Sequence, residues 1–167
     1  ESQGVTGLGL YADGMVEHDG HVGQLLNLLE ELKIADNTIV VYTCDNGPHF
    51  NEWPDGGNTW FRSEKNTNWE GGYRVMGMVR WPGKIKPGTV SNEIMSHLDW
   101  VPTLMGWVGE KQIKQKLLAG HTAAGKNFKV HLDGYDFGPR IEGKAEKGPR
   151  KYYIYSTDGG EISAIRF

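Results

Sequence analysis

Residues 38–48 read Thr38-Ile39-Val40-Val41-Tyr42-Thr43-Cys44-Asp45-Asn46-Gly47-Pro48, a β-branched run that ends in a polar turn. Continuous apolar character is typical of a strand buried on both faces, as in a parallel sheet. Before the run, Tyr11 to Lys33 carries apolar residues at helical spacing: Met15, Val22, Leu25, Leu26, Leu29 and Leu32. Helix, short turn at Asp36-Asn37 and buried strand form half of a βαβ unit, which predicts an α/β fold.

The rest of the chain predicts shorter elements. A second strand is expected from Tyr73 to Arg80 and a short apolar helix from Asp99 to Val108. The polar segment from Glu110 to Arg150 is punctuated by glycine and predicts surface excursions. Residues 151–167 predict a hairpin, because two apolar runs flank Asp158-Gly159-Gly160.

Composition excludes several classes of protein. The 167 residues are 38% hydrophobic and 23% charged, and no apolar run approaches the ~20 residues that a membrane-spanning helix needs. A net charge of −3 gives no electrostatic support to a nucleic-acid partner.

The single cysteine, Cys44, excludes an intramolecular disulfide. The chain begins at Glu1 with no charged-then-apolar leader, which indicates a processed or excised piece.

Asp45 and Asn46 follow the predicted strand and form the sharpest candidate site. Ligands of α/β sheets bind at the carboxyl ends of the strands, and a carboxylate beside a carboxamide offers two hard oxygens to Ca²⁺ or Mg²⁺. Asp-Asn-Gly also makes a simple turn very often. From the residues alone, both interpretations stay open.

The loop from Asp45 to Gly72 is long, irregular and rich in aromatic residues. Its charged residues Arg62, Glu64, Lys65 and Glu70 form either a solvated surface or a place for an anion, which a lysine near a cation site would favour. Its aromatic residues Trp53, Trp60 and Phe61 either line a pocket for an aryl or sugar group or pack the loop.

Several segments together closely resemble the type I sulfatases, the arylsulfatase family. They are Tyr11-Ala12-Asp13-Gly14-Met15-Val16-Glu17-His18-Asp19, Asp36-Asn37-Thr38-Ile39-Val40-Val41, Asp45-Asn46-Gly47, Glu64-Lys65-Asn66-Thr67-Asn68-Trp69-Glu70-Gly71-Gly72-Tyr73-Arg74-Val75, Arg80-Trp81-Pro82-Gly83 and Asp99-Trp100-Val101-Pro102-Thr103-Leu104. Their order and spacing match the later half of that family's catalytic domain.

The resemblance implies a fold and a division of the chain. The expected fold is α/β, the later half of an alkaline-phosphatase-like sandwich with a mostly parallel sheet, running into a small antiparallel C-terminal subdomain. Residues 1–109 would belong to the catalytic domain, 110–150 to a loop-rich excursion and 151–167 to the C-terminal subdomain. A periplasmic or extracellular location is also implied.

The resemblance further implies a sulfuric ester hydrolase with a formylglycine nucleophile and one divalent cation, Ca²⁺ or Mg²⁺. Asp45 and Asn46 match the family's Asp-Asn metal ligands, and Lys65 matches the catalytic lysine that binds the sulfate. The substrate would be a small-molecule or carbohydrate sulfate ester. A non-catalytic scaffold remnant and a phosphate or phosphonate ester hydrolase of the same superfamily are the alternatives.

The chain also departs from the family's pattern. It contains no Cys/Ser-x-Pro-x-Arg motif, from which the formylglycine is made, and it lacks the acidic ligands of the N-terminal half. Ser63 stands where the family often has glycine, and Met76 where it often has proline. The expected partner is therefore the missing N-terminal half of the same protein, without which the chain should bind the ion weakly and not turn over.

Three structural predictions follow from these positions. Asp19 lies on the apolar face of the predicted helix, so its carboxylate should be buried and hydrogen-bonded. Asp45, Asn46 and Lys65 should face one cavity, which requires residues 46–64 to fold back. Glu70 and Arg74 should brace that fold, by pairing with each other or with loop backbone.

Overall fold

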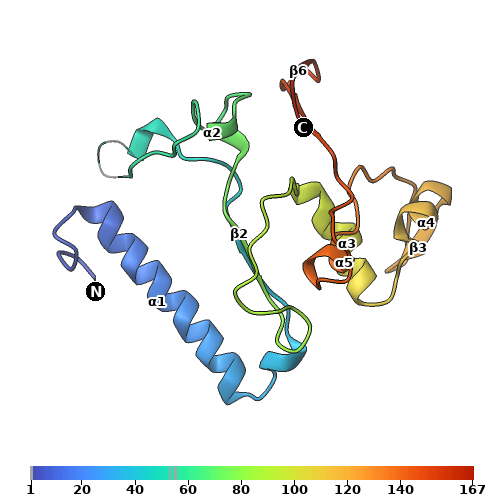
Figure 1. The fold of residues 1–167 in the computed structure, drawn as a ribbon, viewed down its shortest axis with the longest axis horizontal. Coiled ribbons are helices and arrows are strands. Elements are labelled where there is room, and N and C mark those ends of the chain that lie inside the picture. The colour runs from blue at the N-terminus through green and yellow to red at the C-terminus, as the bar shows by residue number, and fades with distance from the viewer. Residues whose placement is uncertain (1, 53, 55) are drawn as a thin grey trace. The chain divides into compact units, whose positions relative to one another are not determined.

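The computed structural model describes residues 2–52, 54 and 56–167 (Figure 1). Two compact units emerge. The first contains the residues up to Gly83 together with Tyr155–Ala164, and the second contains Lys84–Ile154 with Ile165–Phe167.

Helix α1 (Leu10–Glu31) opens the first unit and confirms the predicted amphipathic helix. Asp13 in its first turn is buried and binds the incoming chain, because its carboxylate accepts hydrogen bonds from the amides of Gly4 (2.6 Å) and Thr6 (2.9 Å) and from the Thr6 hydroxyl (2.7 Å). These bonds, led by the Thr6 hydroxyl, lower the pKa of Asp13. The helix ends with Lys33 in the left-handed conformation at φ 58°.

The predicted burial of Asp19 is wrong, because its side chain is exposed. Two apolar positions of the helix are exposed as well: Met15 is 44% exposed and Leu25 is 65% exposed. Val22, Leu26 and Leu29 are half-buried, so the described chain covers the apolar face of α1 only in part. The buried, hydrogen-bonded carboxylate of the helix is that of Asp13, six residues earlier.

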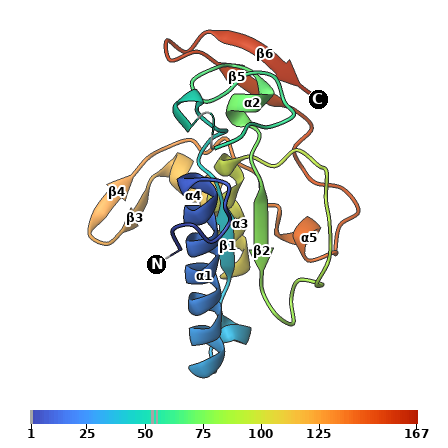
Figure 2. The ribbon, with the colours of Figure 1, turned by 90° about the vertical axis from the view of Figure 1, so that its left-hand side faces the viewer.

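Strands β1 (Val40–Thr43) and β2 (Gly77–Arg80) follow in the first unit, with the short helices η1 (Ala35–Asn37), η2 (Phe50–Glu52) and α2 (Glu70–Tyr73) around them. The two strands run side by side and antiparallel, with Val40 opposite Arg80 and Thr43 opposite Gly77 (Figure 2). The expectation that this strand is buried on both faces is wrong for the described chain, since Val41 is exposed and β1 has one neighbouring strand.

The second unit is organised around α3 (Trp100–Trp107), which confirms the predicted apolar helix and lies against α4 (Ile113–Ala119), α5 (Gly138–Ile141) and η3 (His97–Asp99). Asp99, fully buried at its start, accepts hydrogen bonds from the amides of Ser96 (2.8 Å) and Tyr135 (2.7 Å) and from two guanidinium nitrogens of Arg150 (2.9 and 2.7 Å). The Asp99 bond raises the pKa of Arg150.

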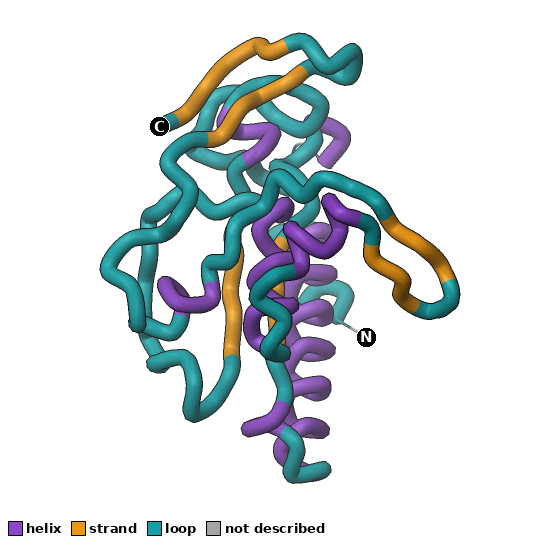
Figure 3. Tube along the Cα trace, turned by 90° about the vertical axis from the view of Figure 1, so that its right-hand side faces the viewer, coloured by secondary structure: helices purple, strands orange, loops and turns teal. Residues whose placement is uncertain are grey.

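Two hairpins complete the described elements (Figure 3). Strands β3 (His121–Ala123) and β4 (Lys126–Phe128) pair antiparallel within the segment that the sequence predicts to be a surface excursion. Strands β5 (Tyr153–Ser156) and β6 (Ile162–Arg166) pair with each other and confirm the predicted C-terminal hairpin. No helix in the described part of the chain combines the length and apolar character needed to cross a membrane.

Candidate functional site

The loop between β1 and β2 folds back on itself. The Lys65 amide donates a 2.9 Å hydrogen bond to the Pro48 carbonyl, and the Gly47 amide donates a 2.9 Å bond to Gly72. The Gly71 amide in turn donates a 2.8 Å bond to Arg62. The required return of residues 46–64 is therefore confirmed, and the segment carrying Lys65 is held against the turn that follows Asp45 and Asn46.

Glycine makes this return possible at two positions. A Cβ atom on Gly47 would lie 1.7 Å from the Gly71 carbonyl oxygen, and one on Gly71 would lie 1.8 Å from the Ser63 carbonyl oxygen. Real Cβ atoms do not approach backbone so closely, so any side chain at either position forces the two segments apart. Gly47 and Gly71 thus allow the close approach between the Asp45 turn and the Lys65 turn.

Asp45 and Asn46 lie directly after β1 and present oxygens of the type that Ca²⁺ and Mg²⁺ prefer. One Asp45 carboxylate oxygen accepts the Asn46 amide at 2.9 Å, which leaves its second oxygen available. The Asn46 side-chain nitrogen donates to the Gly47 carbonyl at 2.9 Å, so its amide oxygen is the atom left for a ligand. The donor chemistry fits a hard cation, but two such residues supply only part of its six to eight ligands.

The described residues contain no cluster of three or more His, Cys, Asp or Glu side chains that could hold a metal ion. A cation at Asp45 and Asn46 would therefore need further ligands besides the His, Cys, Asp and Glu side chains of the described residues. Cys44, immediately before them, is half-buried.

Lys65 is half-buried and lies in a tight turn. Ser63 and Asn66 on either side of it adopt left-handed conformations, with φ 65° and 67°. The Thr67 hydroxyl closes the turn by donating a 2.6 Å hydrogen bond to the Glu64 carbonyl. Asparagine tolerates the left-handed region, whereas serine is strained there.

Cation–aromatic contacts and one ion pair brace the loop. Glu70 pairs with Arg74 at 3.6 Å, which confirms the prediction that these two residues support the fold. The Arg74 guanidinium also lies 4.3 Å from the centre of the Phe61 ring, and that of Arg62 lies 4.0 Å from the Trp69 ring. Phe61 therefore packs the loop.

The other two aromatic candidates behave differently. Trp60 is fully exposed and does not pack the loop. Trp53 lies outside the described residues.

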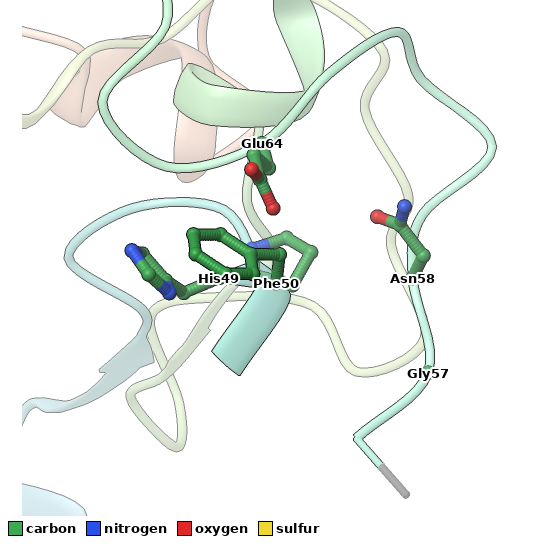
Figure 4. A pocket seen from close by; sticks show the side chains of 6 residues that line it. His49, Phe50, Gly57, Asn58 and Glu64 are labelled. Atoms are coloured by element: carbon green, nitrogen blue, oxygen red, sulfur yellow. The ribbon is translucent and has the colours of Figure 1, made fainter. Parts of the chain in front are cut away.

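A small hollow of about 110 Å³ opens beside the returning loop (Figure 4). Its lining consists of Pro48, His49, Phe50, Gly57, Asn58 and Glu64. Asp45, Asn46 and Lys65 are not part of this lining, but Pro48 and Glu64 are their near neighbours in sequence. The convergence of Asp45, Asn46 and Lys65 on one cavity stays a prediction.

Most residues of this hollow, among them His49 and Asn58, carry no motif or periodic pattern that marks them in the sequence. Their placement depends on the return of the loop at Pro48 and Lys65. The Gly71-Gly72 pair was the available signal, since adjacent glycines in an otherwise bulky segment mark a close backbone approach.

Comparison with known proteins now decides the family. The family model described as Sulfatase matches residues 6–110. The chain belongs to the sulfatase family. The match includes the whole of the returning loop, with Asp45, Asn46 and Lys65.

Curated relatives agree with this assignment. The chain is 33% identical to human steryl-sulfatase over 165 residues, which covers 95% of the chain and 26% of that protein. It is 32% identical to human arylsulfatase A, with 96% of the chain and 29% of that protein covered. The chain thus spans somewhat more than a quarter of the length of these relatives.

Solved structures show the same relationship. The PsFucS1 sulfatase from Pseudoalteromonas sp. superimposes with a TM-score of 0.77 at 30% identity, covering 93% of this chain and 28% of that one. Ps i-CgsB, solved in complex with a neocarrahexaose, gives a TM-score of 0.65 at 27% identity and covers 88% and 30% of the two chains. The fold of the chain is therefore that of a part of a sulfatase.

Proposed function

We propose that this chain is the later part of an enzyme that hydrolyses sulfate esters, with Asp45, Asn46 and Lys65 in its active site. The observation that carries the proposal is the 2.9 Å hydrogen bond from the Lys65 amide to the Pro48 carbonyl. It ties the segment of the matched lysine to the segment of the matched Asp-Asn pair within a chain of the sulfatase family.

The proposed roles follow from charge. Lys65 binds the sulfate oxygens as a point charge and stabilises the negative charge that develops as the ester oxygen leaves. Asp45 and Asn46 contribute oxygens to the Ca²⁺ or Mg²⁺ site. A bound divalent cation supplies positive charge opposite the sulfate.

The remaining parts of the machinery lie outside this chain in this proposal. They are the formylglycine nucleophile and the acidic metal ligands of an N-terminal half. Within the chain, residues 1–109 belong to the catalytic domain, whose mostly parallel sheet would be formed together with strands of the other half. Residues 110–150 form an excursion, residues 151–167 enter an antiparallel C-terminal subdomain, and the enzyme works in the periplasm or outside the cell.

The direct test is an assay of the whole protein with p-nitrophenyl sulfate and p-nitrophenyl phosphate, each with and without EDTA. Faster release of nitrophenol from the sulfate, abolished by EDTA and restored by Ca²⁺ or Mg²⁺, supports the proposal. Faster hydrolysis of the phosphate favours a phosphate ester hydrolase of the same superfamily. No hydrolysis of either ester by metal-loaded protein favours a non-catalytic scaffold.

A further inference from the structure

The hollow beside the returning loop has a lining that the proposed chemistry does not use. Sulfate cleavage as proposed involves Asp45, Asn46 and Lys65, whereas the hollow is formed by Pro48, His49, Phe50, Gly57, Asn58 and Glu64. The hydrogen bond between Lys65 and Pro48 nevertheless joins the two places. The segment that carries Lys65 therefore adjoins the hollow, whose lining includes Pro48 and Glu64.

We propose that the hollow is the subsite for the alcohol part of the sulfate ester, and that this part is an uncharged sugar ring. The inference rests on the proposed sulfatase function and names its substrate class. Hydrogen-bonding capacity, aromatic surface, size and charge each bear on it.

The free hydrogen-bonding groups of the hollow suit hydroxyl groups. The Asn58 side-chain oxygen accepts the Thr59 amide at 2.8 Å, so its nitrogen is left to donate. The Asn51 amide donates to Nδ1 of His49 at 3.1 Å, so a neutral His49 carries its proton on Nε2 and donates from there. Among the described residues the Glu64 carboxylate has no hydrogen-bond or ion-pair partner. Two donors and a carboxylate acceptor match a ring with several hydroxyls.

The aromatic part of the hollow offers a flat apolar surface. His49 and Phe50 stack with ring centres 4.7 Å apart and an interplanar angle of 27°. Phe50 is nevertheless 65% exposed. Figure 4 shows the Glu64 carboxylate directed toward the Phe50 ring, with Asn58 facing them across the hollow. A sugar ring can place its C–H face on Phe50 while its hydroxyls reach the polar groups.

The size and charge of the hollow favour an uncharged sugar ring over other alcohols. The volume of about 110 Å³ lies well below the ~300–1,000 Å³ of pockets that enclose drug-sized ligands, so the hollow fits one ring better than the four fused rings of a steroid. An apolar alcohol would also leave the polar groups unpaired. The negative Glu64 disfavours a ring that carries a second sulfate or a carboxylate.

The test compares substrates on the whole protein: galactose 6-sulfate and glucose 6-sulfate, p-nitrophenyl sulfate as a ring without hydroxyls, and estrone sulfate as a steroid. The variants are Phe50→Ala and Glu64→Gln, with Glu31→Gln on α1 as the matched control. For each variant we expect kcat/KM to fall for the sugar sulfate that the unsubstituted protein cleaves faster. This fall should be on the order of tenfold larger than the fall for p-nitrophenyl sulfate. Glu31→Gln should not change this ratio.

Binding of the unsulfated sugars, followed by saturation-transfer NMR, separates the two proposals. If p-nitrophenyl sulfate is cleaved but neither variant alters the substrate ratio, the subsite is wrong and the sulfatase function stands. If no ester is cleaved but sugar binding is lost in Phe50→Ala and Glu64→Gln, the hollow binds a sugar and the sulfatase function is wrong. A preference for estrone sulfate, or sugar binding that both variants leave intact, overturns the subsite.

Discussion

The amide of Lys65 and the carbonyl of Pro48, seventeen positions apart in the sequence, are joined by a 2.9 Å hydrogen bond. This bond closes the loop between β1 and β2 and brings the lysine segment beside the turn that carries Asp45 and Asn46. Because the bond involves backbone atoms, the loop geometry does not depend on the Lys65 side chain. The side chain is therefore free for a role in binding.

Gly47→Ala should disrupt this loop. The added Cβ would lie 1.7 Å from the Gly71 carbonyl oxygen, and relief by backbone movement typically costs about 1–3 kcal/mol or more. Chemical unfolding of the whole protein measures the loss. Gly20→Ala on α1 is the control, since no atom lies within 4 Å of its new Cβ and alanine gains roughly 0.5–1 kcal/mol in a helix. Equal stability of the two variants would contradict the close approach.

Ser63→Gly should have the opposite effect. Ser63 is held at φ 65°, which strains an L-residue by roughly 1–2 kcal/mol. Glycine removes that strain but gains freedom in the unfolded chain, so a net stabilisation of about 0.5–1 kcal/mol is expected in the same unfolding measurement. Ser63→Ala keeps the Cβ atom and should give no such gain. If Ser63→Ala also stabilised the protein, loss of the serine hydroxyl and not relief of backbone strain would explain the gain.

Much of the secondary structure could be predicted from the sequence. Helices α1 and α3 follow from apolar periodicity, and the β5–β6 hairpin from two apolar runs around Asp158-Gly159-Gly160. Helix α4 and the β3–β4 hairpin were not predicted. Helix α4 has only seven residues, and the two strands of the hairpin have three residues each and are largely exposed. Such short polar strands carry little periodic signal.

Contacts with distant backbone were harder to predict. Asp19 was expected to be buried because it shares a helix face with apolar residues, but the described chain covers that face only in part and leaves the Asp19 side chain exposed. Asp13 is buried instead, since the chain before α1 wraps around its carboxylate. An acidic residue in the first turn of a helix was the available signal. In the candidate site, sequence reasoning found Asp45, Asn46 and Lys65 only through family resemblance, and the hollow depends on a loop return that no local pattern encodes.

Glu93 should make the stability of the second unit depend on acid pH. The Arg140 guanidinium, followed by the Gly148 amide, hydrogen-bonds the carboxylate and lowers the pKa of Glu93 from its ordinary value of 4.5. Its stabilisation is therefore complete above pH 4.5 and is lost as the pH falls through the lower, folded-state pKa.

Glu93→Gln should accordingly destabilise the protein by about 1–2 kcal/mol at pH 7, and the difference from the unsubstituted protein should shrink at acid pH. Unfolding curves between neutral and strongly acid pH measure this. Glu146→Gln, at an exposed position in the same unit, is the control. A difference that stays constant with pH would exclude the charged form of Glu93 as the source.

Asp45→Asn should weaken divalent-cation binding by the whole protein. It exchanges a charged oxygen ligand for a neutral one, and the expected loss of affinity is at least about 10–100-fold. Elemental analysis after dialysis against dilute chelator measures the retained Ca²⁺ and Mg²⁺. Asp36→Asn, an exposed aspartate in η1, should keep the metal. Full retention in Asp45→Asn would remove this residue from the metal site.

The most direct measurement of the central claim is the steady-state kinetics of Lys65→Ala in the whole protein with p-nitrophenyl sulfate. We expect a fall in kcat/KM on the order of 10²-fold or more, as for the loss of one preorganised charge-stabilising group. Thermal stability should hardly change, because the loop is closed by the Lys65 backbone. Lys111→Ala, at an exposed position of the second unit, should retain full activity. Normal sulfatase kinetics in Lys65→Ala would exclude Lys65 from the active site.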